Sequence, residues 1–258
     1  MLDQFLLGAV FGFLVAVVSY VAYVLTKSGA MAAFALAVVI YGCGGWMWTV
    51  PIVTFFVTSS ILSRIGRAKK LQFSEKFEKF GARDWAQVLA NGGVPGFLAL
   101  LTSVLPVQQL YPLYLASVAA AAADTWGTEI GVLARGRVIS VVAIKPVPPG
   151  TSGGISLAGT LGGAMGAVAV AFSGYTWYSG IKVVLVVVVS GIAGSLADSL
   201  LGATLQARFR CPVCGSETER GEHCGRTTEL GGGVQWIRND LVNVVCTMIG
   251  AFVAWVLL

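Results

Sequence analysis

The chain has 258 residues, of which 56% are hydrophobic and only 11% are charged, and its mean hydropathy is +0.81. Soluble domains carry about 25% charged residues, so this composition excludes an ordinary soluble protein and indicates an integral membrane protein. The net charge of +5 does not point to nucleic acid. The basic residues collect in loops between apolar runs, and no aromatic–basic pattern for nucleic acid accompanies them.

Apolar runs of about 20 residues predict an all-α fold, a polytopic bundle that forms one transmembrane domain over residues 1–258. The expected spans are 5–25, 30–43, 46–63, 86–106, 111–134, 154–173, 181–206 and 234–257. The second run is short and the fourth begins with polar residues, so seven or eight spans are expected. The first run lacks the basic flank and cleavage site of a secretory signal, so it is expected to be retained.

Lysines and arginines concentrate in three loops, at 64–83, 135–150 and 207–230. Eight alternating spans put these loops on one side of the membrane, and their positive charge predicts that this side is cytoplasmic. Both termini are then outside. Within the basic segment 64–90, Phe73, Phe77 and Phe80 recur at helical spacing, which favours an amphipathic helix on the cytoplasmic membrane surface.

Four acidic residues, Asp124, Glu129, Asp198 and Asp240, lie inside these apolar runs. A carboxylate in hydrocarbon is costly unless it faces protein or water, so such residues are functional candidates. The predicted topology places all four within roughly 15 Å of the cytoplasmic boundary, where they can share a pocket. Their convergence favours Mg²⁺ that also holds phosphate; the alternative is interhelical hydrogen bonding or a proton relay.

A glycine-rich loop provides a candidate phosphate cradle. It runs from Lys145 to Ser156 and precedes a predicted helix. Backbone N–H groups at such a position bind phosphate, and Lys145 adds a positive charge. The alternative is an ordinary Pro/Gly turn in which Thr151 or Ser152 caps the helix.

A polar stripe enters the fourth span. It contains Asp84 and Asn91, with Arg83 placed to meet an anionic phosphate. The alternative is the start of an interfacial helix, with an aspartate at its positive end.

Cysteines form a further cluster. Cys211 and Cys214 have the spacing of half a zinc knuckle, and His223 and Cys224 follow, which completes four candidate Zn²⁺ ligands. A second C-x-x-C pair is missing, and adjacent ligands at 223 and 224 are geometrically awkward. His223 alternatively serves the membrane site or is a bystander. The predicted cytoplasmic location disfavours a stable disulfide.

Several stretches together resemble the integral-membrane family of phytyl-phosphate kinase, which is distantly similar to polyprenol and dolichol kinases. The resemblance runs in order over roughly residues 80–245, through 83–93, 124–129, 149–154, 194–199, Gln206 and 239–243. It implies a kinase that transfers a phosphoryl group from a nucleoside triphosphate, with CTP favoured, to a prenyl monophosphate such as phytyl or geranylgeranyl phosphate. The cysteine insert is seen in microbial-type members.

The combined hypothesis assigns catalysis to Asp124, Asp198, Asp240 and Lys145, and Mg²⁺ binding to Asp124, Glu129, Asp198 and Asp240. The residues assigned to the lipid phosphate and the nucleotide are Arg83, Asp84, Asn91, Thr128, Gly150, Thr151, Ser152, Gly153, Gly154, Ser195, Gln206, Asn239 and Asn243. The alternatives are a polyprenol kinase or a CTP-dependent cytidylyltransferase, and, from another class, an ion-coupled transporter. The membrane-embedded chain is compatible with a homo-oligomer.

Overall fold

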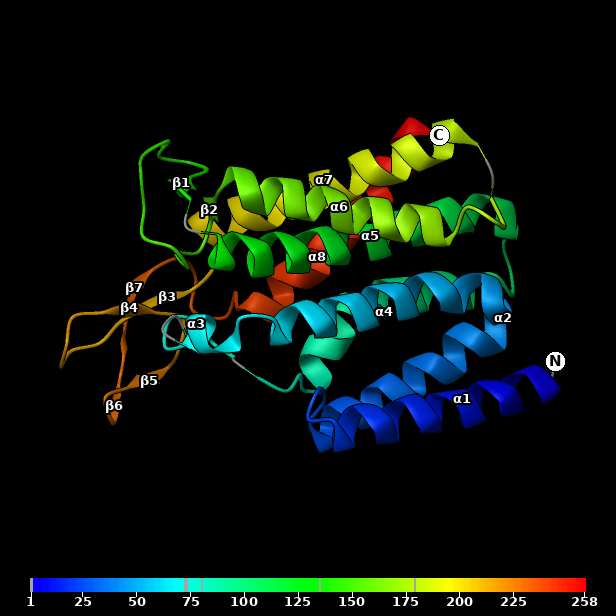
Figure 1. Cartoon of the computed structure of the whole chain (residues 1–258), viewed down its shortest axis with the longest axis horizontal. Coiled ribbons are helices and arrows are strands. Elements are labelled where there is room, and N and C mark those ends of the chain that lie inside the picture. The colour runs from blue at the N-terminus through cyan, green and yellow to red at the C-terminus, as the bar shows by residue number, and fades with distance from the viewer. Residues whose placement is uncertain (1, 72–73, 80, 135, 179) are drawn as a thin grey trace.

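A computed structural model describes residues 2–71, 74–79, 81–134, 136–178 and 180–258. Within these residues the chain is mostly helical, as predicted, and it contains eight helices (Figure 1). They are α1 (Leu2–Val21), α2 (Lys27–Arg64), α3 (Arg67–Leu71), α4 (Trp85–Leu101), α5 (Val107–Leu133), α6 (Leu157–Ser173), α7 (Ile181–Thr204) and α8 (Asn239–Leu257). By length and composition α1, α2, α7 and α8 can cross a membrane, whereas α4 and α6 are apolar but shorter.

Helix α2 reverses direction at Gly45, whose φ of 62° and ψ of −152° are not helical. A straight helix of 38 residues would be about 57 Å long. The guanidinium of Arg64, the last residue of α2, nevertheless donates to the carbonyl oxygen of Ala22, which lies just before its start. The two arms therefore lie antiparallel (Figure 1). The break falls between the predicted spans 30–43 and 46–63.

The centre of the bundle is α5, which packs against α2, α4, α6, α7 and α8. Small residues allow these backbones to approach closely. A Cβ atom at Gly163 of α6 would lie 2.7 Å from the carbonyl oxygen of Ala123, and one at Gly194 of α7 would lie 2.6 Å from Cβ of Ala120. This close packing brings the polar end of α5 beside the polar ends of α6 and α7.

The chain termini lie at one end of the bundle and the long polar connections lie at the other (Figure 1). These connections contact one another through ion pairs and contain short strands. The strands are β1 (Ile139–Ser140), β2 (Gly154–Ile155), β3 (Arg208–Arg210), β4 (Glu217–Thr218), β5 (Glu222–His223), β6 (Arg226–Thr227) and β7 (Glu229–Gly232). Pairing is antiparallel, β1 with β2, β4–β3–β7 in one sheet, and β5 with β6.

The basic segment 64–90 differs from the predicted surface helix. Only Arg67–Leu71 is helical before α4 begins at Trp85, and the residues described between them form turns and bends. Phe73 and Phe80, on which that prediction partly depended, lie outside the described residues. The segment folds back over the end of the bundle because its backbone is bound by the later 207–238 connection, a contact that the local sequence pattern does not encode.

Candidate functional site

A cavity of about 370 Å³ lies at the polar end of the bundle, among α2, α4, α5, α6, α7, α8 and the connections. Most of the predicted site residues line it. These are Arg83, Asn91, Asp124, Thr128, Glu129, Gly150, Thr151, Ser152, Gly153, Gly154, Ser195, Asp198, Gln206, Asn239 and Asn243. Residues that are far apart in the sequence therefore meet at a single site.

Asp124 of α5 and Asp198 of α7 both line the cavity, and their carboxyl groups lie close enough to interact with each other. The Oδ2 atom of Asp198 is buried and has no hydrogen-bond partner among the described residues. Two carboxylates this close repel each other unless a proton or a cation lies between them. The pair, with its unsatisfied oxygen, fits a hard cation such as Mg²⁺, which prefers oxygen ligands.

The other two predicted magnesium ligands have cationic partners instead. Glu129 forms an ion pair with Lys70 of α3 and accepts a hydrogen bond from Ser63. Asp240, at the first turn of α8, binds Nζ of Lys79 at 2.6 Å. Among the described residues, the four carboxylates do not form a group whose ligand atoms all lie within 4.8 Å of one another. The structure divides them into one carboxylate pair and two ion pairs.

Lys79 connects two polar clusters that the sequence presented separately. Its Nζ lies 2.8 Å from Oδ2 of Asp84 and 2.6 Å from Oδ2 of Asp240. Asp84 also caps α4 by accepting from the backbone N–H of Gln87, in a capping box. Burial alone would raise the pKa of Asp84, but the hydrogen bonds from Lys79 and Gln87 lower it. Asp84 therefore caps the start of α4, which is the alternative role that the sequence offered for it. It does not line the cavity.

The glycine-rich loop lines the cavity, but it is not the first turn of a helix. Helix α6 begins at Leu157 with Ser156 as its N-cap, so neither Thr151 nor Ser152 caps it. The loop is a turn in which Gly150 and Gly153 have φ of 77° and 74°. Ser152 lies 3.3 Å from Gln206, which ties the turn to the end of α7. Lys145 lies on the exposed β1–β2 connection, outside the set of residues that line the cavity.

Basic side chains other than Lys145 reach the cavity. Arg83 lines it and donates to Ser60 and Ser63 at 3.1 and 3.4 Å. Four further cations line the cavity, namely Arg64, Arg67, Lys70 and Lys79. In the sequence these four indicated only the orientation of the chain in the membrane. The high density of basic residues in the 64–83 loop could have indicated an anion-binding role. The sequence did not reveal that this loop folds over the cavity.

A partly buried acid at the cavity edge was also missed. Glu219 lines the cavity and accepts from the backbone N–H of Glu78. Burial raises the pKa of Glu219 to about 7. Its carboxyl group therefore changes charge near neutral pH, unlike an ordinary surface glutamate.

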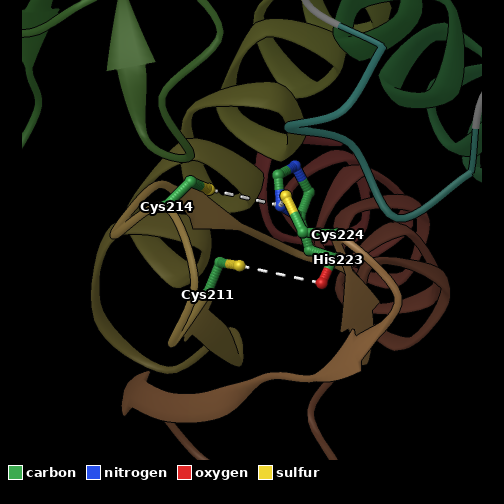
Figure 2. A group of neighbouring side chains, drawn as sticks. All are labelled: Cys211, Cys214, His223 and Cys224. Atoms are coloured by element: carbon green, nitrogen blue, oxygen red, sulfur yellow. Dashed lines mark hydrogen bonds between the residues drawn. The ribbon is translucent and has the colours of Figure 1, made fainter.

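The predicted cysteine cluster does assemble. Cys211, Cys214, His223 and Cys224 point toward one another (Figure 2), and their ligand atoms all lie within 4.8 Å of one another. The φ of 53° at Cys224 turns the β5–β6 hairpin so that two adjacent residues face one point, which resolves the awkward spacing. Hydrogen bonds from Ser216 lower the pKa of Cys214 to about 6, which favours the metal-binding thiolate. This cluster can hold a metal ion.

Comparison with known proteins places the chain in a family. Protein PGR of Arabidopsis thaliana is 31% identical over 93% of this chain and 91% of its own length. A membrane protein of Methanocaldococcus jannaschii is 34% identical over 66% of this chain and 70% of its own length. Protein VTE6, chloroplastic, of Arabidopsis thaliana is 26% identical over 89% of this chain and 64% of its own length. No solved structure matches.

The sequence pattern of the integral membrane protein family DUF92 matches residues 10–251, nearly the whole chain. The matched region includes every helix from α2 to α7 and every residue that lines the cavity. The long apolar helices agree with that description of a multi-pass integral membrane protein. The chain therefore belongs to the DUF92 family of integral membrane proteins.

Proposed function

We propose that the chain is a membrane kinase that transfers the terminal phosphoryl group of a nucleoside triphosphate, preferably CTP, to a prenyl monophosphate such as phytyl or geranylgeranyl phosphate. The product is the prenyl diphosphate. The observation that carries the proposal is the single cavity in which the Asp124–Asp198 pair, five basic side chains and the 150–154 turn meet. The motif resemblance to the phytyl-phosphate kinase family supplies the reaction class.

Phosphoryl transfer depends mainly on positioning and on neutralising phosphate charge, and this lining is suited to both. Asp124 and Asp198 would hold Mg²⁺, which when bound neutralises and orients the nucleotide phosphates. The backbone N–H groups of 150–154 would bind phosphate oxygens, as glycine-rich turns do. Arg83, which is held in place by Ser60 and Ser63, would orient the lipid monophosphate.

Other positions have supporting roles in this proposal. A monophosphate oxygen is already a nucleophile, so the reaction needs no strong base. Glu129 and Asp240, with their partners Lys70 and Lys79, position the cations that border the cavity. Asn91, Thr128, Ser195, Asn239 and Asn243 offer neutral hydrogen bonds to the substrates. The prenyl tail would lie between α6 and α7, where Ala164, Ile192 and Leu196 line the cavity.

A product assay tests the proposal. Purified protein is incubated with Mg²⁺, labelled CTP or ATP, and a panel of prenyl phosphates and free prenols. The expected product is a prenyl diphosphate with release of the nucleoside diphosphate. Asp198→Asn should lower the rate about 100-fold or more. Asp3→Asn, on the first turn of α1 at the opposite end of the bundle, is the matched control.

Two other activities give different results in the same experiment. A polyprenol kinase would phosphorylate the free alcohol, with Asp124 as the base, and a cytidylyltransferase would release pyrophosphate and form a CDP-lipid. An ion-coupled transporter would turn over no nucleotide and would move its substrate in proteoliposomes. Absence of diphosphate product with every lipid and nucleotide would refute the kinase proposal.

A further inference from the structure

The cysteine cluster lies beside the cavity and is connected to it through one short segment of chain. Residues 74–79, here called the edge segment, follow α3 and carry Phe77, Glu78 and Lys79 into the cavity lining. The same segment is bound along its length by residues 218–220, which lie between the two halves of the cysteine cluster.

The contacts to the edge segment are mostly made to its backbone. Thr218 donates its hydroxyl to the carbonyl oxygen of Glu75, at 2.5 Å. Arg220 donates to the carbonyl oxygens of Phe77 and Ser74, at 3.1 and 2.7 Å. The backbone N–H of Glu219 donates to the carbonyl oxygen of Lys76 at 2.9 Å. Four successive carbonyl oxygens, from Ser74 to Phe77, thus accept hydrogen bonds from residues 218–220. A backbone held by several donors keeps one conformation only while those donors are themselves fixed.

The cysteine cluster fixes these donors. Cys214 precedes residues 218–220 and His223 follows them, so a metal bound by both halves closes a short loop around the donors. Nδ1 of His223 lies 3.5 Å from Sγ of Cys214 and 3.2 Å from Sγ of Cys224. Ligand atoms around one tetrahedral Zn²⁺ lie about 3.3–3.8 Å apart, from bond lengths of about 2.0–2.3 Å. Closing a loop removes conformational freedom from the residues within it.

The histidine has the partner that a zinc-bound imidazole requires. Its Nε2 lies 3.3 Å from Oε2 of Glu75, in the edge segment itself. An imidazole that binds metal through one nitrogen commonly donates from the other to a carboxylate, which fixes the ring. The edge segment therefore contributes to the metal site, and the metal site in turn binds the edge segment.

We infer that Cys211, Cys214, His223 and Cys224 bind one structural Zn²⁺, and that this ion holds the edge segment against the cavity. The soft thiolate set favours zinc over Mg²⁺ or Ca²⁺, and four protein ligands leave no open position for catalysis. The ion does not contact the substrates in the cavity, and its effect on the cavity is indirect. It fixes residues 218–220, these bind the edge segment, and the edge segment places Lys79 between Asp84 and Asp240.

The test measures metal content and backbone accessibility in the full-length protein in detergent. We expect one zinc per chain by elemental analysis in the wild type and in Cys43→Ser, a matched control in α2. We expect none in Cys214→Ser. Trypsin cleavage after Lys76 and Lys79, mapped by mass spectrometry, should be roughly tenfold faster in zinc-stripped wild type, and re-added zinc should reverse the change.

Arg220→Gln separates the two parts of the inference. This variant should retain one zinc but cleave in the edge segment as fast as the stripped protein, because the donors to Phe77 and Ser74 are lost. Wild-type protein without zinc, or stripped protein whose cleavage after Lys76 and Lys79 is unchanged, would overturn the inference. No lipid or nucleotide is used, so the result is independent of the reaction at the cavity.

Discussion

The ion pair between Lys70 and Glu129 offers the sharpest test of how the acidic residues divide their roles. The sequence suggested Glu129 as a magnesium ligand, whereas the structure pairs it with Lys70, whose side chain is only 4% exposed. Lys70 also donates to the carbonyl oxygen of Leu62 at 2.7 Å. Its ammonium group thus has two acceptors, the Glu129 carboxylate and the Leu62 carbonyl oxygen, and we expect the pair to stabilise the fold.

The expected loss of stability follows from the burial of the ion pair. Removing one partner of a buried ion pair costs about 3–5 kcal/mol, because the other charge remains buried and uncompensated. In Lys70→Met the remaining carboxylate of Glu129 is 20% exposed and keeps its hydrogen bond from Ser63, so we expect about 3 kcal/mol, the lower limit. For a chain of this size that lowers the Tm by roughly 6–12 °C.

The measurement is a double-mutant cycle. The Tm of detergent-purified Lys70→Met, Glu129→Met and the double variant is followed by tryptophan fluorescence. If the pair is structural, the double variant regains most of the lost stability, because both charges are absent. Losses that add to within about 0.5 kcal/mol would refute the ion pair. They would return Glu129 to the metal-ligand role, in which Mg²⁺ should raise the Tm of Lys70→Met.

Three further predictions concern the loop, a titrating acid and the core. Gly153→Ala places a Cβ 2.4 Å from Cβ of Ala203 at a φ of 74°, so it should destabilise by about 1–3 kcal/mol and reduce nucleotide-dependent activity. Glu219 has its pKa raised by burial from 4.5 to about 7, so the folded state retains a proton that the unfolded chain loses. The contribution of Glu219 to the free energy of unfolding should therefore fall as pH rises from 4.5 to 7, by at most about 3 kcal/mol, and Glu219→Gln should remove that contribution from pH-dependent melting curves. Tyr114→Phe removes the buried hydrogen bond to the carbonyl oxygen of Trp48 and should cost about 1 kcal/mol by the same Tm assay, without altering activity at saturating substrate.

Much of the fold could be predicted from hydropathy, because long apolar runs have few alternatives to membrane helices. Each predicted span coincides with a helix or with one arm of α2. The predicted spans differ from the helices mainly in where they begin and end. Helix α6 begins at Leu157 and α8 begins at Asn239, both later than predicted, because the residues before them pair as strand or bind the connections. Hydropathy does not distinguish a helix start from an apolar loop that packs on the bundle.

The candidate site was only partly predictable. Polar residues inside apolar runs identified Asp124, Asp198 and Asn243 correctly as cavity residues. They did not identify Lys70 and Lys79, which come from the basic segment between α2 and α4, and Lys145, predicted to bind phosphate, lies outside the cavity lining. The spacing of charges along a loop does not reveal where the loop folds, because that depends on contacts made more than 100 residues later.

The sequence by itself determined that this chain is a multi-pass membrane protein with acids in its spans, a glycine-rich turn and a four-ligand cysteine cluster. These are local properties of composition and spacing. Only the tertiary structure decided which acids meet. Glycine and alanine along α5, α6 and α7 allow the backbones to approach until Asp124 faces Asp198. The loops then fold back and supply Glu129 and Asp240 with cations, because a charge at the edge of a bundle is stable only when another part of the chain compensates it.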